Sequence, residues 1–303
     1  MLDTIPRFPD LADLEIEHKP AIDALCADLR PQTSELTFTN LYIWRHAYAA
    51  KITQLDDVVC IVSLRPDPED SFLLPPLGEH ASAEHVRECL RWMAEQGHDA
   101  RLARIDRVQM ERLGITDHGF DIAEDRDNSD YVYRVADLIA LEGGGYADKR
   151  HHLERFAKRF DFEYREITPE LVPGCQWLQE LWCDEKHCDL HSSLRAEARA
   201  INEVLEKLDE LDVTGGAILV NDRVQAFSLG EPLNDDTVVI HIEKASPDLH
   251  GAFQVINQQF LAHAWSGWQY VNREQDLGIR GLRQAKESYQ PHHMVEKYVV
   301  RGR

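Results

Sequence analysis

The sequence lacks any long apolar segment. None of its hydrophobic runs approaches the roughly 20 residues that a membrane-spanning helix needs. The opening residues, MLDTIPRFPDLADLEIEHKP, have neither the basic nor the apolar region of a secretory signal. Hydrophobic residues still make up 43% of the 303 residues and charged residues 29%, which is typical of a globular protein. We therefore expect no membrane span and, by default, a cytoplasmic location.

Cysteine is too sparse for a disulfide scaffold, because only six occur in 303 residues. We expect all six to be reduced thiols. The segment CDEKHCDLH resembles a metal site, since it contains Cys183, His187, Cys188 and His191. If the segment is one helix, however, the pair Cys183 and His187 (i, i+4) points in a different direction from the pair Cys188 and His191 (i, i+3). The spacing also matches no common zinc pattern. We expect no metal there.

Basic residues are outnumbered, with 33 Lys and Arg against 54 Asp and Glu and a net charge of −21. This balance argues against a surface that binds nucleic acid or membrane over its whole area. Basic residues do gather in two predicted helices: Lys149, Arg150, Arg155, Lys158 and Arg159 in one, and Arg280, Arg283 and Lys286 in the other. If both helices line one cleft, they could bind tRNA phosphates. The alternative, which is more common, is a solvated charged helix face.

The length predicts two domains. Three glycines in LEGGGYAD interrupt both the helical and the strand periodicity of apolar residues. We therefore place the boundary there, with one domain at 1–145 and the other at 146–303. The elements predicted in the first half follow the order strand, strand, helix, strand, helix, strand. DYVYRVADL is the last of these strands. The second half has a similar order and closes with the strand MVEKYVV. A duplicated α/β unit is the architecture that this pattern predicts.

The clearest pattern lies in the second half, where GGAILV, RVQAFSLGEPL and TVVIHIEKA alternate with Asx-rich turns. This predicts a three-stranded antiparallel meander. A helix should follow, with Ser246 as its N-cap, Pro247 in the first turn and Gly267 after its end. WQYVNRE then predicts a strand and GIRGLRQAKESY a helix.

Several segments together resemble the C-terminal domain family of phosphatidylglycerol lysyltransferase. They are NLYIWR, KRHHLERF, IHIEKA, GAFQVINQQF, NREQDLG, GLRQAKESYQP and EKYVV. The resemblance implies an α/β (α+β) fold of two tandem GNAT-like domains, each a mixed, mostly antiparallel sheet flanked by helices. It also implies transfer of an aminoacyl group from aminoacyl-tRNA to an amine or hydroxyl, with a small molecule or a lipid headgroup as acceptor. We expect the N-terminal domain to be mainly structural.

In a GNAT fold the fourth and fifth strands splay apart, so catalytic residues are expected at their ends. Alternation puts His241 and Glu243 on one face of TVVIHIEKA and Lys244 on the other. In WQYVNRE, Asn272 and Glu274 share a face with Tyr270, opposite Arg273. Acyl transfer needs a base and a donor to the developing oxyanion, so we assign Glu243 as base and Asn272 or Arg273 as carbonyl-orienting groups. The alternative is that Glu243, Lys244, Arg273 and Glu274 form ion pairs that tie the strand ends together.

In the last helix, Arg283, Lys286 and Tyr289 fall on neighbouring parts of one face. Tyr289 could act as general acid, although a tyrosine of the core is an equally good interpretation. The predicted substrate-binding residues are His241, Lys244, Gly251, Glu274, Arg283, Lys286, Lys149 and Arg150.

The loop after Glu243 decides which donor the sequence favours. GNAT enzymes hold the pyrophosphate of coenzyme A on a glycine-rich loop at a helix N-terminus. In SPDLHGA only Gly251 fits that pattern, while Pro247 removes an N–H donor and Asp248 adds a negative charge. We therefore expect no coenzyme A cofactor. An acyl-CoA-dependent N-acyltransferase and a non-catalytic ligand-binding protein remain as alternatives.

Overall fold

The computed structural model describes residues 2–303, which form two compact units. Unit 1 contains Met1–Asp130, Gln275–Gly278 and Val295–Arg303, and unit 2 contains Tyr131–Glu274 and Ile279–Met294. Each unit has its own sheet, in agreement with the expected pair of GNAT-like units. The units do not follow the predicted division at 145/146, because each takes in chain from the other half of the sequence.

The sheet of unit 1 has the strand order β1-β2-β3-β4-β5-β14-β6. Its strands are β1 (Ala12–Asp13), β2 (Ala50–Leu55), β3 (Val58–Ser63), β4 (Phe72–Leu73), β5 (Arg101–Ile105), β6 (Phe120–Glu124) and β14 (Tyr298–Gly302). Its helices are α1 (Lys19–Leu29), α2 (Phe38–Tyr48), α3 (Ala83–Glu95) and α4 (Arg107–Leu113). In this sheet β4 and β5 pair in parallel, and all other neighbouring strands pair antiparallel. Helix α3 packs against β5 and β14, where its Val86, Cys89 and Met93 enter the core.

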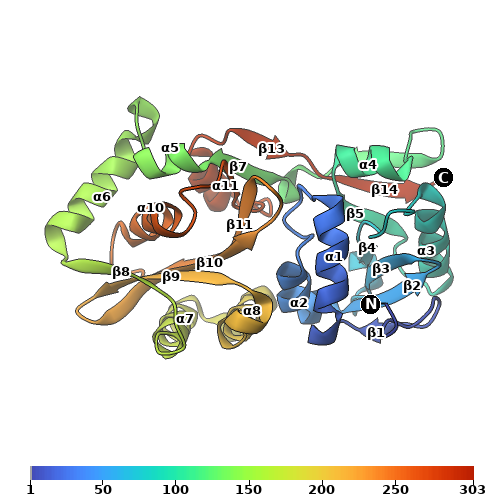
Figure 1. The fold of residues 1–303 in the computed structure, drawn as a ribbon, viewed down its shortest axis with the longest axis horizontal. Helices are drawn as coiled ribbons and strands as arrows, with labels where there is room; N and C mark the ends of the chain where they lie inside the picture. Colours follow the sequence, from blue (N-terminus) through green and yellow to red (C-terminus); the bar gives the residue numbers. More distant parts are fainter. Residues whose placement is uncertain (1) are drawn as a thin grey trace. The chain divides into compact units, whose positions relative to one another are not determined.

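The sheet of unit 2 has the order β13-β7-β12-β11-β10-β9-β8. Its strands are β7 (Asp130–Arg134), β8 (Phe162–Glu166), β9 (Thr214–Val220), β10 (Arg223–Pro232), β11 (Thr237–Ala245), β12 (Tyr270–Asn272) and β13 (His293–Val295). Its helices are α5 (Val135–Ala140), α6 (Ala147–Arg159), α7 (Val172–Lys186), α8 (Ser192–Glu206), α9 (Leu208–Leu211), α10 (Ala252–Ala264) and α11 (Arg280–Glu287). Helix α10 covers one face of β9–β11, and α7 and α8 cover the other (Figure 1).

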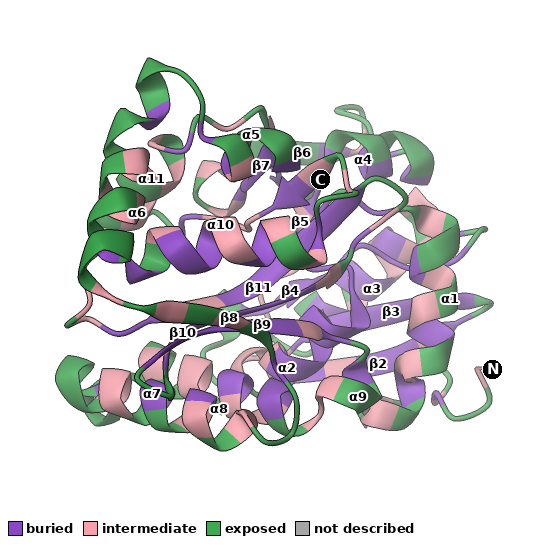
Figure 2. Cartoon of the chain, turned by 60° about the vertical axis from the view of Figure 1, so that its left-hand side comes forward, coloured by how far each residue is buried: buried purple, intermediate pink, exposed green. Residues whose placement is uncertain are grey.

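The predicted meander is confirmed, and its sequence explains why. Asn221 and Asp222 both have positive φ, 52° and 60°, as a two-residue turn between twisted antiparallel strands requires. The strands β9, β10 and β11 are mostly buried, whereas α6 exposes most of its surface (Figure 2). The core between this sheet and α10 contains Phe156, Phe260 and Trp265.

Two strand predictions are wrong in their partners, because a strand joins the sheet that can bury it and not the nearest sheet in sequence. DYVYR was expected to close the first half, but it forms β7 and pairs with β12 of unit 2. The C-terminal strand was expected in the second half, but β14 lies between β5 and β6 of unit 1.

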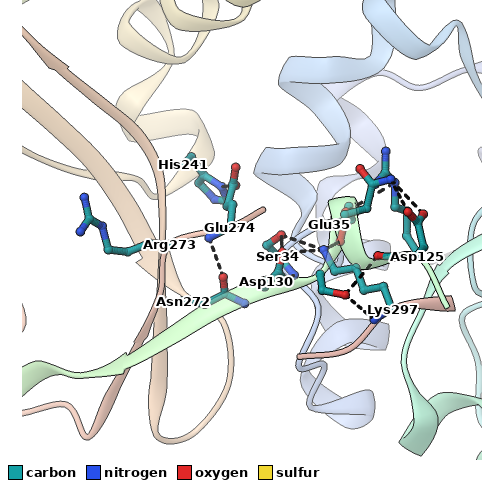
Figure 3. A network of polar contacts seen from close by, with 12 residues as sticks. Ser34, Glu35, Asp125, Asp130, His241, Asn272, Arg273, Glu274 and Lys297 are labelled. Carbon is teal, nitrogen blue, oxygen red and sulfur yellow. Dashed lines mark hydrogen bonds and ion pairs between the residues drawn. The ribbon is translucent and has the colours of Figure 1, made fainter. Parts of the chain in front are cut away.

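A buried lysine fixes the start of β14 in unit 1. The Lys297 ammonium lies 2.6 Å from both a Glu35 and an Asp130 carboxylate oxygen and 3.4 Å from the Ser34 hydroxyl (Figure 3). Burial opposes its charge, but Asp130 and Glu35 raise the pKa of Lys297 above its usual value. The ammonium is therefore charged and has an acceptor for each of its three donors.

Helix α10 starts later than the sequence predicts. Ser246 does not cap it: the N-cap is Gly251, at φ 96°, and the first helical residue is Ala252. Residues 246–251 form a turn instead, and the backbone N–H of Ser246 donates to the Gln225 carbonyl. The extended strand β11 continues to Ala245, so the chain needs these residues to reverse its direction before the helix begins.

Two of the six cysteines are not free thiols, which corrects the sequence prediction. Helix α7 ends at Lys186, and His187 adopts a left-handed conformation with φ 52°. This turn brings the Cα atoms of Cys183 and Cys188 to 5.0 Å, and the two form a disulfide. The other four form no disulfide and are buried.

Candidate functional site

The parallel strands β11 and β12 stop pairing before β11 ends. Their register joins Thr237 to Tyr270 and Val239 to Asn272, and β11 then continues to Ala245 paired with β10 but not with β12. Glu243 lies on this part of β11, and Arg273 directly follows β12. The predicted splay between the two strands is therefore present in unit 2.

The Glu243 and Arg273 side chains meet at the splay. Arg273 Nη2 lies 2.9 Å from Glu243 Oε1, and Asn257 Nδ2 of α10 donates to Glu243 Oε2 at 3.2 Å. Both charged side chains are only 14% exposed. Although burial disfavours the guanidinium charge, Glu243, Tyr133 and Tyr289 raise the Arg273 pKa further above its already high value.

One donor of this arginine has no acceptor. Arg273 Nη1 is buried and makes no hydrogen bond to any atom of residues 2–303. A buried donor without a partner costs about 1–3 kcal/mol, so few are found in proteins without a reason. Nη1 is thus a buried donor that the Glu243 pair holds in place and whose hydrogen-bonding capacity the described residues do not use.

Tyr289 completes the cluster with two cations near its ring. The Arg273 guanidinium carbon lies 4.9 Å and the Lys149 ammonium 4.3 Å from the ring centroid. Lys149 also donates to the Ser288 hydroxyl at 2.6 Å. Burial lowers the pKa of Lys149 and raises that of Tyr289 well above its usual value. The sequence-predicted residues Glu243, Arg273, Tyr289 and Lys149 therefore form one connected group, the transfer cluster.

His241 belongs to a separate contact set. A bulge between β10 and β11 pairs Leu229 with Ile242 and Gly230 with Ile240, which leaves His241 as the extra residue and interrupts the predicted alternation. Its ring nitrogens contact Glu231 Oε1 at 2.8 Å and Glu274 Oε1 at 2.9 Å. Figure 3 shows His241 beside Glu274. Burial alone would lower its pKa, but the two carboxylates raise the pKa of His241 to about 9.

Asn272, predicted to orient the carbonyl, and Lys286, predicted to bind substrate, hold the backbone around β12. Asn272 Oδ1 accepts the Glu274 backbone N–H at 2.8 Å, and Lys286 donates to the carbonyls of Arg273 and Glu274. Arg283, on α11, is half-buried. These contacts shape the turn that carries Arg273.

The remaining three predicted residues lie away from the transfer cluster in their contacts. Lys244 Nζ lies 3.0 Å from Glu197 of α8 and 3.6 Å from the ring centroid of Trp182 of α7. Arg150 donates to the carbonyls of Leu141 and Gly143. A Cβ on Gly251 would lie 2.9 Å from the His152 carbonyl oxygen of α6, so this glycine serves close packing.

The alternative prediction, that ion pairs tie the strand ends together, is therefore confirmed in part. Glu243 pairs with Arg273 as that interpretation requires, whereas Lys244 and Glu274 have other partners, Glu197 and His241.

Sequence reasoning missed Asn257, Glu231 and Tyr133. Tyr133 donates through its hydroxyl to the Lys286 carbonyl at 2.8 Å and lies 5.8 Å from Arg273, measured from ring centroid to guanidinium carbon. No local pattern marks it, because its strand was assigned to the other half. Asn257 had a usable signal, because it is the one polar residue on the buried side of α10.

Of the described residues, no group of three or more His, Cys, Asp or Glu could hold a metal ion, and no helix has the length and apolar character to cross a membrane.

Comparison with known proteins identifies one family by its sequence model. Residues 26–301 match the model of the phosphatidylglycerol lysyltransferase C-terminal family. A conserved protein of unknown function from Bacteroides thetaiotaomicron has 31% identity and a TM-score of 0.87, with 97% of this chain and 99% of that chain covered.

Two further solved structures share the fold at 13% identity. One is a C-terminal domain assigned to a lysylphosphatidylglycerol synthetase of Agrobacterium fabrum, with a TM-score of 0.63 and coverage of 94% of this chain and 90% of that chain. The other is L-PGS from Bacillus licheniformis, with a TM-score of 0.58 and coverage of 86% and 90%.

Proposed function

Because the chain belongs to the phosphatidylglycerol lysyltransferase C-terminal family, we propose that it transfers an aminoacyl group from aminoacyl-tRNA to an amine or hydroxyl acceptor. The family and the GNAT-type transferase fold support group transfer. The donor and the acceptor classes are part of the proposal.

The unpartnered Nη1 donor of Arg273 is the observation that carries this proposal. When an amine or hydroxyl attacks an ester carbonyl, negative charge develops on the carbonyl oxygen, and a donor already in place stabilises it without reorganisation. Glu243 fixes the guanidinium through Nη2, so Nη1 keeps its position before substrate arrives. In this proposal Nη1 holds the carbonyl oxygen of the aminoacyl ester.

Glu243 and Tyr289 supply the proton-transfer roles. The Glu243 carboxylate takes a proton from the attacking amine or hydroxyl. Burial keeps Tyr289 protonated, so its hydroxyl gives a proton to the departing ribose oxygen, which leaves as the free hydroxyl of the tRNA. Arg155, Lys158 and Arg159 of α6 are exposed and offer positive charge to tRNA phosphates.

The turn before α10 argues against coenzyme A as carrier of the acyl group. Gly251 packs directly against the His152 carbonyl, Pro247 offers no N–H, and Asp248 is exposed. A pyrophosphate would meet a carboxylate at the place where GNAT enzymes present backbone donors.

A second candidate is a ligand-binding protein without turnover. It is favoured by the contacts of Glu243, whose two carboxylate oxygens already accept from Arg273 and Asn257. Such a protein would bind the aminoacyl group at Arg273 and release no product.

The test is a transfer assay with mixed radiolabelled aminoacyl-tRNAs, small-molecule amines and phosphatidylglycerol vesicles as acceptors, and a parallel panel of acyl-CoA thioesters. We expect label to leave tRNA with the wild type and about 100-fold more slowly with Glu243→Gln. Glu163→Gln is the matched control, because Glu163 forms an exposed pair with Arg165 at 2.8 Å.

Equal rates for Glu243→Gln and Glu163→Gln would reject Glu243 as base. Transfer from thioesters alone would reject the tRNA donor. Binding of aminoacyl-tRNA without any product would favour the second candidate.

A further inference from the structure

Unit 1 contains a cavity of about 450 Å³ that the transfer reaction does not use. Every residue that lines it belongs to unit 1, and the lining includes Arg65, Arg101, Arg104 and Arg301. This volume lies within the range of small-molecule sites, roughly 300–1,000 Å³. Four arginines around one cavity need an explanation in a chain where acidic residues outnumber basic ones.

Arg104 is held in an uncommon backbone conformation. The pairing of β5 with β14 shifts between Tyr298 and Val300, so two residues of β5, Ala103 and Arg104, oppose Val299. Arg104 adopts φ 63°, in the left-handed region that residues other than glycine seldom occupy. Such bulges re-aim side chains, and such backbone conformations gather at binding and active sites.

The Arg104 guanidinium also has an incomplete set of partners. Its Nη1 is buried without a hydrogen bond to any atom of the described chain, residues 2–303. Its nearest carboxylate is Glu35, with Nε 3.7 Å from Oε1, and Glu35 already binds Lys297 through Oε2. Burial raises the pKa of Glu35, which further weakens its compensation of Arg104. Arg104 therefore lines the cavity with a guanidinium group that the described residues leave incompletely paired.

The other three arginines have limited compensation as well. Arg101 and Arg301 share the same oxygen of Asp99, at 3.2 Å and 2.8 Å. Arg65 lies 4.0 Å from Asp70, at the limit of an ion pair. One carboxylate, Asp99, thus serves two guanidinium groups. The lining as a whole contains four arginines and three carboxylates, Asp70, Glu124 and Asp125. Of the acidic lining residues, Asp125 is engaged by the Asn128 amide at 2.8 and 2.9 Å.

An apolar wall stands beside these arginines. Tyr48 and Phe72 meet edge to face with ring centroids 5.7 Å apart, and both line the cavity together with Ala103 and Val299. A wall of this kind packs against carbon atoms, so the lining suits an organic molecule better than a bare ion.

We propose that this cavity binds a small organic oxyanion, a carboxylate or a phosphate ester, with Arg104, Arg101 and Arg301 around the charged group. The carbon part of the ligand packs on Tyr48 and Phe72. Guanidinium groups match both oxyanions through paired N–H donors. Unit 1 then has a binding role of its own and is more than a structural support.

Titration calorimetry at fixed ionic strength tests this proposal, with inorganic phosphate, glycerol phosphate and citrate as probes and chloride as the reference anion. We expect saturable binding of at least one probe. Whether the phosphate probes or citrate bind more tightly tells which charged group the cavity prefers. Arg301→Gln should weaken binding about tenfold, the effect of losing one charge-assisted contact.

Two further variants distinguish binding in the cavity from nonspecific attraction of the probe to surface charge. Arg303→Gln is the matched control, because Arg303 is an exposed arginine two residues further along that pairs with Asp121 and does not line the cavity. It should bind as the wild type does. Ala123→Phe fills the cavity from the exposed strand β6 without changing charge, and should abolish binding.

Equal weakening by Arg301→Gln and Arg303→Gln, or undiminished binding to Ala123→Phe, would overturn the proposal. So would the absence of binding for all three probes at millimolar concentration.

Discussion

Two buried cations, Lys297 in unit 1 and Arg273 in unit 2, differ in how completely they are paired. Lys297 has Ser34, Glu35 and Asp130 within hydrogen-bonding distance, one acceptor for each donor. Arg273 has Glu243 on Nη2 and nothing among the described residues on Nη1. A complete set of partners is what a structural network needs, whereas an open donor costs stability unless a ligand meets it. The difference teaches where to look for a binding site, namely at the buried cation whose hydrogen-bond donors are not all paired within the protein.

The largest effect should come from breaking the complete network. Lys297→Met leaves Asp130 and Glu35 buried without their cation, so we expect a loss of about 3–5 kcal/mol in the free energy of unfolding. Urea denaturation measures it. Lys51→Met is the control, because Lys51 pairs with the exposed Asp13, and it should cost less than about 1 kcal/mol. A Lys297→Met variant as stable as Lys51→Met would contradict a structural role for Lys297.

A second network, Glu231–His241–Glu274, sharpens the comparison through its pH dependence. The folded pKa of His241, about 9, lies above the unfolded value near 6.5. Its stabilisation is therefore complete below about pH 6.5 and disappears as the pH rises through 9. The free-energy gap between wild type and His241→Gln should shrink by an amount on the order of 3 kcal/mol between pH 6 and pH 10. A gap that stays constant over this range would show that His241 is not protonated in the folded protein.

The smallest effect concerns Gly251, a predicted binding residue whose contacts indicate packing. Gly251→Ala combines φ 96° with a Cβ only 2.9 Å from the His152 carbonyl, so we expect a loss of about 1–2 kcal/mol in unfolding free energy. Gly267→Ala meets nothing within 4 Å and should change stability little. Thermal denaturation of both variants checks this. Equal melting temperatures would mean that the loop moves aside and that packing does not require glycine at 251.

Much of unit 2 could be predicted from sequence because its signals are local. Asn221 and Asp222 mark the β9–β10 turn, and the apolar spacing of α10 marks its core face. The position of β14 could not be predicted, because its partners β5 and β6 lie more than 170 residues away in sequence and no local pattern indicates the pairing.

The candidate site divides in the same way. Alternation placed Glu243 and Lys244 on opposite sides of β11, and they do contact helices on opposite faces of the sheet, Asn257 of α10 and Glu197 of α8. The bulge at His241 broke that alternation, and no sequence signal precedes it. The pairing of Arg273 with Glu243, and the donor left over on Nη1, depend on the distance between two strand ends, which the sequence does not encode locally.

The most direct test of the central claim compares Arg273→Lys with Arg165→Lys in the aminoacyl-tRNA transfer assay. Both changes keep the charge and remove the guanidinium, and Arg165 pairs with Glu163 on the exposed strand β8. We predict that Arg273→Lys lowers kcat about 100-fold with little change in KM, because the lost donor acts on charge that develops during the reaction, while Arg165→Lys keeps the wild-type rate. Equal, undiminished kcat values in both variants, each folded by circular dichroism, would contradict the assignment of Arg273 to the reacting carbonyl.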